Sequence, residues 1–111
     1  MFRVFQGKLV NGTVALRARP NDVAVEWDIY QISTTLDNMN HSVYVDLMYN
    51  GFFLANSFQG QKDCATGPPD VVVQPSDIFE IVFYNGVSGD LATAGIWYNE
   101  NPTGTTYSTA H

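Results

Sequence analysis

The chain has 111 residues, 45% of them apolar and 14% aromatic, which is enough for one domain with a packed core. Its formal net charge of −6 argues against nucleic-acid binding as the main role, because proteins hold phosphates mainly through clustered Lys and Arg. The single cysteine, Cys64, excludes an internal disulfide, and the sequence predicts neither a signal peptide nor a transmembrane segment, since it contains no long apolar run.

The charged residues are divided into two blocks. Four of the five basic residues lie among the first nineteen positions, and all eleven acidic residues follow, accompanied only by Lys62. The basic block consists of Arg3, Lys8, Arg17 and Arg19. A basic segment on an acidic domain can bind the acidic surface of a neighbouring molecule, so we expect the chain to act through contacts with other proteins.

Apolar and polar residues alternate with a period of two in the N-terminal half, which predicts β-strands. Asn11-Gly12 is typical of a type I′ turn, so residues 2–10 and 13–17 are predicted to pair, and residues 1–19 to form a basic hairpin. The next strand covers residues 22–30. We expect one face of it to be buried (Val23, Val25, Trp27, Ile29) and the other to be a solvated acidic face (Asp22, Ala24, Glu26, Asp28, Tyr30).

The C-terminal half continues the pattern. Residues 43–49 are predicted to turn Val43, Val45, Leu47 and Tyr49 inward, and Asn50-Gly51 to reverse the chain into residues 52–54. A long surface connection at 57–70 and a short strand at 71–73 follow. Residues 78–84 are almost continuously apolar and should lie centrally in a sheet, and residues 92–98 form the last strand.

About eight short strands with one long connection predict an all-β fold, a single antiparallel β-sandwich of the jelly-roll type over residues 1–100. An immunoglobulin-like sandwich is the structural alternative. Residues 101–111 are polar and without periodicity. We interpret them as a C-terminal arm that is tied down on its own domain or on a neighbour.

Residues suited to catalysis or metal binding are sparse, and we predict neither an enzyme nor a cofactor or metal. Only His41 and His111 supply imidazole, and no nucleophile motif accompanies them. Loop oxygens that could bind calcium are better explained as turn-forming side chains; they belong to Asp37, Asn38, Asn40, Asp63, Asp70, Asp77 and Asp90. Glu26, Asp28 and Asp46 could approach one another as a glycosidase pair, but a solvated acidic face is the preferred interpretation.

Aromatic residues suggest an alternative function. Tyr30, Tyr44 and Trp97 would stack on sugars if they were exposed and coplanar, as in a carbohydrate-binding β-sandwich or adhesin. The competing interpretation is that most aromatic rings fill the space between the sheets. Exposed tyrosine is also typical of protein interfaces, so exposure by itself does not separate the two functions.

Several segments together have a recognisable pattern of strands and turns: residues 27–33, 43–51, 67–69, 71–77, 89–94 and 97–98. This pattern resembles small β-sandwich accessory and decoration proteins of tailed bacteriophage virions. Ser76-Asp77 stands where a Gly-Asp pair is expected, and the resemblance supplies no catalytic residues. It implies a non-enzymatic virion component, assembled in the host cytoplasm, that decorates a capsid or lies on a tail.

The leading hypothesis is therefore a structural protein that forms homo-oligomers and binds capsid or tail proteins of the same particle, with no nucleic acid and no membrane as partner. The residues predicted to bind these partners are Arg3, Lys8, Arg17, Arg19, Pro102 and Tyr107. A glycan is the alternative partner, bound by Tyr30, Tyr44 and Trp97.

Overall fold

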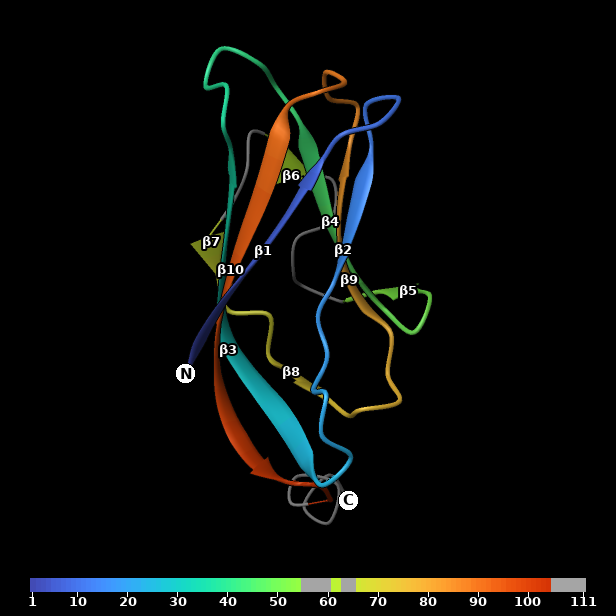
Figure 1. The fold of residues 1–111 in the computed structure, drawn as a ribbon, viewed down its shortest axis with the longest axis vertical. Helices are drawn as coiled ribbons and strands as arrows, with labels where there is room; N and C mark the ends of the chain where they lie inside the picture. The colour runs from blue at the N-terminus through green and yellow to red at the C-terminus, as the bar shows by residue number, and fades with distance from the viewer. Residues whose placement is uncertain (55–60, 63–65, 105–111) are drawn as a thin grey trace.

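Two antiparallel β-sheets pack face to face in the computed structural model, which describes residues 1–54, 61–62 and 66–104 (Figure 1). The first sheet contains β1 (Phe2–Lys8), β10 (Leu91–Pro102), β3 (Val25–Leu36), β7 (Thr66–Gly67) and β8 (Val71–Val73). The second contains β2 (Val14–Arg17), β9 (Phe79–Tyr84), β4 (Tyr44–Tyr49), β5 (Phe52–Phe53) and β6 (Gln61–Lys62). The all-β sandwich predicted from the sequence is confirmed.

The strand order identifies the topology. The first sheet has the order β1-β10-β3, with β7 and β8 pairing in tandem along the far edge of β3, and the second has β2-β9-β4, with β5 and β6 along β4. β1 to β4 thus alternate between the two sheets, and so do β8, β9 and β10, as in a jelly roll. An immunoglobulin fold would place its first two strands in one sheet, so that alternative is wrong.

The core lies between the sheets and follows the period-two pattern. Val43, Val45 and Leu47 are fully buried, as predicted. β9 lies between β2 and β4, the predicted central position, and buries Phe79, Ile81 and Phe83. The largest buried rings are those of Trp27 and Tyr98, which stack with centroids 4.3 Å apart. Large aromatic side chains contribute most of the buried apolar area in a small core.

The predicted N-terminal hairpin over residues 1–19 is wrong, although its turn is present. Asn11 and Gly12 both have positive φ, at 53° and 78°, and Val10 pairs with Thr13. β1 nevertheless pairs with β10, and β2 pairs with β9 in the other sheet. An Asn-Gly turn reverses the chain locally, but the sheet that each arm joins depends on which partner strands cover its apolar residues.

The strand predicted for residues 22–30 differs at its start. β3 begins only at Val25, and Val23 is 82% exposed although it was predicted to be inside. Glu26 was predicted on the solvated face and is instead fully buried. Oε1 of Glu26 accepts hydrogen bonds from Gln74 Nε2 at 3.1 Å and from the backbone N–H of Gly104 at 2.8 Å, so distant segments cover this carboxyl group.

The last strand continues into the predicted C-terminal arm. β10 ends at Pro102, and Thr103 then donates from its N–H to the carbonyl oxygen of Ala24 at 2.9 Å and from its hydroxyl to that of Val23 at 2.9 Å. The start of the arm is therefore held on its own domain. In the described part of the chain, no helix has the length and apolarity needed to cross a bilayer.

Candidate functional site

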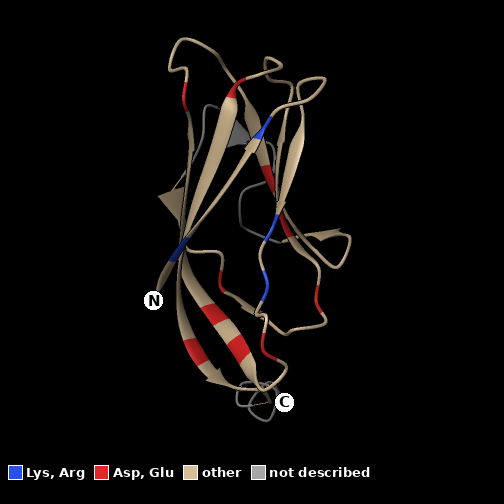
Figure 2. Cartoon of the chain, viewed as in Figure 1, with Lys and Arg blue, Asp and Glu red and all other residues tan. Residues whose placement is uncertain are grey.

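The four basic residues of the N-terminal block lie along one side of the sandwich (Figure 2). Within the described part of the chain, β1 pairs only with β10 in the first sheet and β2 pairs only with β9 in the second, so both are edge strands. Arg3 and Lys8 belong to β1, Arg17 ends β2, and Arg19 follows two residues later. We call this side, defined by these four residues, the basic edge.

Three of the four basic-edge residues line one cleft of about 240 Å³. They are Arg3, Arg17 and Arg19, which are all the arginines of the chain. We call this cleft the arginine cleft. The residues that line it are Arg3, Phe5, Arg17, Ala18, Arg19, Asn21, Asp77, Ile78 and Phe79. It opens where β1 of one sheet faces β2 and the loop before β9 of the other. Lys8 lies at the far end of β1, opposite Leu91, and does not line the cleft.

The three arginines differ in their contacts. Nε of Arg17 lies 3.2 Å from Glu80 Oε2, but the Arg17 side chain is 69% exposed, so this surface pair contributes little stability. The guanidinium carbon of Arg3 lies 5.1 Å from the ring centroid of buried Trp27, a cation–π contact. Among the described residues, Arg19 has no hydrogen-bond or ion-pair partner.

Asp77 is the acidic residue in the lining, and its carboxylate is already bonded. It accepts from the hydroxyl of Tyr49, from the backbone N–H of Gln74 at 2.8 Å and from Asn50 Nδ2 at 3.2 Å. Burial, followed by the bond to Asp77 and its negative charge, raises the pKa of Tyr49 well above its ordinary value. These donors hold the Asp77 carboxylate in the turn between β8 and β9.

A row of aromatic side chains crosses the outer face of the first sheet beside the basic edge. Phe2 on β1 and Trp97 on β10 pair directly, with ring centroids 4.6 Å apart. The β10–β3 register shifts at Trp97, leaving Tyr30 as an extra residue on β3, where it is 46% exposed. Phe2 was not predicted as a site residue, because its place beside Trp97 follows only from the strand register.

Tyr44, the third predicted sugar-stacking residue, does not join this row. It lies on β4 in the other sheet, where its ring is 5.6 Å from that of Tyr84. The two outer faces of a sandwich point in opposite directions, so Tyr44 cannot form one platform with Tyr30 and Trp97. Of the two residues predicted in the arm, Pro102 ends β10, and Tyr107 lies outside the described residues.

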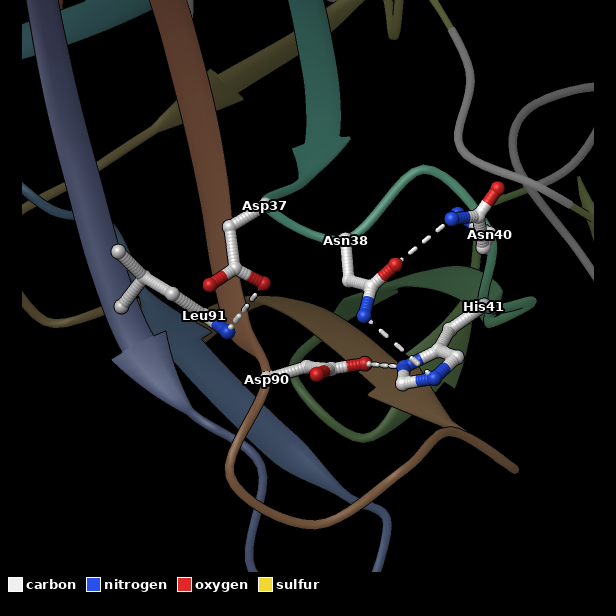
Figure 3. Close-up of polar contacts among 6 residues, drawn as sticks. All are labelled: Asp37, Asn38, Asn40, His41, Asp90 and Leu91. Atoms are coloured by element: carbon white, nitrogen blue, oxygen red, sulfur yellow. Dashed lines mark hydrogen bonds and ion pairs between the residues drawn. The ribbon is translucent and has the colours of Figure 1, made fainter.

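The loops at one end of the sandwich hold most of the oxygens considered for calcium (Figure 3). Asp37 accepts from the N–H of Leu91 at 3.0 Å, and Asn38 accepts from that of Asn40 at 3.0 Å. His41 donates from Nδ1 to Asp90 at 2.6 Å. Asp63 lies outside the described residues. Within the described ranges, no group of three or more His, Cys, Asp or Glu could hold a metal ion.

Asp46 does not approach Glu26 and Asp28, as the less favoured glycosidase interpretation would require. Asp46 belongs to β4, while the other two residues belong to β3 in the opposite sheet. On its own face, Asp46 accepts a hydrogen bond from the hydroxyl of Tyr84 at 3.3 Å. A glycosidase needs its two carboxyl groups on either side of one substrate-binding cleft, and these strands do not provide that arrangement.

No family model, curated protein or solved structure matches this chain. Its functional assignment therefore depends on the jelly roll, the basic edge and the arginine cleft described above.

Proposed function

We propose that this protein is a non-enzymatic structural component of a virion, which decorates a capsid or lies on a tail. It forms homo-oligomers and binds neighbouring subunits of the same particle through the basic edge and the C-terminal arm. The virion assignment comes from the sequence resemblance and from the jelly roll, a fold used by many viral capsid proteins. A fold is shared by many functions, so the binding role needs support from the surface itself.

The observation that carries the binding role is the placement of the cations. Arg3, Lys8, Arg17 and Arg19 all lie along two neighbouring edge strands of a chain whose formal net charge is −6. Such a concentrated positive region attracts acidic protein surfaces, including the acidic remainder of another copy, and so orients the molecule with its basic edge toward them. Orientation of this kind is what a subunit needs to join a lattice in one register.

Apolar contact must accompany these charges, because an exposed ion pair contributes only about 0 to 1 kcal/mol. The basic edge offers such contact on β1, where Phe2 is 52% and Val4 is 50% exposed. An edge strand also presents unpaired backbone N–H and C=O groups to a partner. Repetition around a symmetric particle then multiplies a modest affinity per site.

The proposal is tested on particles purified by gradient centrifugation from cells that carry the gene. Quantitative mass spectrometry of washed particles is expected to recover the chain in a fixed ratio to the major capsid or tail protein. Charge reversal at the basic edge, Arg19→Glu with Lys8→Glu, should reduce its occupancy. Lys62→Glu serves as control. Lys62 belongs to β6, which pairs with β4 and is separated from β2 by β4 and β9. Particles that lack the chain would refute the virion role.

A second function is favoured by the aromatic row of Phe2, Trp97 and Tyr30. Three rings on adjacent strands of one sheet face resemble a stacking surface for a glycan, and lectins also use jelly rolls. A glycan array on the native protein tests this. Binding that Trp97→Ala abolishes, while the basic-edge variants leave it intact, would favour the carbohydrate-binding alternative over the structural one.

A further inference from the structure

The arginine cleft has the composition of a site for a carboxylate that the described part of the chain does not supply. All three arginines line it, together with one acidic residue, Asp77. Asp77 is already bonded to Tyr49, Gln74 and Asn50. Among the described residues, the three guanidinium charges therefore face two carboxylates, Asp77 in the lining and Glu80 in the exposed pair with Arg17, so the cleft keeps an excess of positive charge.

Two of the three guanidinium groups have donors to spare. The guanidinium carbon of Arg3 lies 5.1 Å from the Trp27 ring centroid, and neither the Arg3 nor the Arg19 guanidinium donates a hydrogen bond to any group in the described part of the chain. A guanidinium has five N–H donors in a planar fork that matches the two oxygens of a carboxylate. The cation–π contact with Trp27 also restricts the Arg3 side chain in advance, which lowers the entropy lost when a ligand binds.

The shape and the floor of the cleft favour a protein segment over a free ion. Its volume of about 240 Å³ is roughly eight times the ~30 Å³ that one water occupies in the liquid, so a side chain fits inside. Phe5, Ala18 and Phe79 provide apolar lining, and Ile78 is 43% exposed beside them. β1 lies along one wall, and no strand in the described ranges pairs with its outer edge, so that edge can align an extended segment.

We infer that the arginine cleft binds a Glu or Asp side chain of an extended acidic segment of the partner protein, with Arg3 and Arg19 as the principal donors. This inference rests on the proposed function and specifies the chemistry of its partner. The partner carboxylate would accept hydrogen bonds from the guanidinium groups that Asp77 does not bind. Apolar residues next to it in the partner segment would cover Ile78 and Phe5.

The test uses ¹⁵N-labelled protein and a synthetic decapeptide of alternating glutamate and valine. The chain has three arginines, so its spectrum contains three arginine Nε–H signals, all from the cleft. We expect all three to shift on titration, and a decapeptide of alternating lysine and valine to leave them unchanged. Arg19→Glu should weaken binding by about tenfold or more, as expected for loss of a charge-assisted hydrogen bond.

A matched variant separates the cleft from general electrostatics. Lys62→Glu changes the net charge by the same amount as Arg19→Glu, but β6 pairs with β4 on the opposite edge of the second sheet from β2, so it should weaken binding by less than about twofold, because surface charge alone is screened by salt. An equal loss in Lys62→Glu would overturn the inference. The inference would also be overturned if inorganic phosphate shifted the arginine signals at lower concentration than the glutamate peptide does, because the cleft would then be a site for free anions.

The outcomes for the cleft and for the virion role are distinguishable. Glutamate-peptide binding is measured on the isolated protein, whereas the virion role is measured as occupancy on particles. A chain that occupies particles but whose arginine signals ignore the peptide would overturn the cleft alone. If the isolated protein binds the peptide and Arg19→Glu weakens that binding, but the chain is absent from particles, the cleft remains a site for an acidic ligand and the virion role is refuted.

Discussion

Replacing Glu26 by alanine should strongly destabilise the protein. Glu26 is fully buried, and Oε1 accepts from Gln74 Nε2 and from the N–H of Gly104. The truncation leaves the donors of Gln74 and Gly104 without their acceptor, which costs about 1–3 kcal/mol each, and relief of the desolvation cost of the carboxyl group offsets part of the loss. We expect a net loss of about 3 kcal/mol. For a chain of this length, about 4 °C of melting temperature corresponds to 1 kcal/mol, so the expected fall is about 12 °C.

Glu26→Gln is the matched control, because it keeps the size of the side chain and one oxygen acceptor and replaces the other carboxyl oxygen with an amide NH2 group. Its melting temperature should fall by about 4 °C, equivalent to about 1 kcal/mol. Thermal unfolding followed by circular dichroism measures both values, and amide hydrogen exchange at Gly104 measures the anchor of the arm directly. A Glu26→Ala protein that melts within about 3 °C of the wild type, with Gly104 still protected, would refute the reasoning.

Three further predictions concern stability. Gly86→Ala places a Cβ 2.3 Å from Leu9 Cδ2, so urea unfolding should show a loss of about 1–3 kcal/mol in stability. Leu9→Val removes that methyl group, so the double variant should lose less stability than the sum of the two single variants. Asp77→Ala should lose about 2 kcal/mol in urea, because it removes an acceptor shared by three donors, and an equally unstable Asp77→Asn would contradict this. The raised pKa of Tyr49 favours its neutral form in the folded state. The stability that this contributes is fully present below the ordinary tyrosine pKa of about 10 and falls as pH rises above it. Urea titrations at pH 9 to 11 should therefore show a shallower fall in stability for Tyr49→Phe than for the wild type.

The sequence was most informative about which face of each strand is buried. Alternation at Val43, Val45 and Leu47 and the apolar run at 78–84 predicted the inner face and the central strand, and both are confirmed. This pattern is local, because side chains of a strand alternate between faces whatever its neighbours are. The two Asn-Gly turns at 11–12 and 50–51 also formed with positive φ at both residues.

Pairing and burial between distant segments could not be predicted in the same way. The turn at Asn11-Gly12 does not specify that β1 joins β10, a strand more than eighty residues later. Glu26 fits the polar phase of its strand, yet its bonding partners lie 48 and 78 residues further along the chain. The arginine cleft likewise exists only because β1 and β2 end in opposite sheets with their edges facing one side.

The basic edge has a second physical explanation, which the structure helps to weigh. Proteins often place Lys or Arg on edge strands to prevent pairing with other molecules. On the opposite edges, however, β5 to β8 are only two or three residues long, and short strands already limit pairing. β1 has seven residues and exposes Phe2 and Val4 on its outer face, which would promote association instead of preventing it. Charges that served only as protection would not gather with apolar residues around one cleft, so this combination favours a surface that binds a partner.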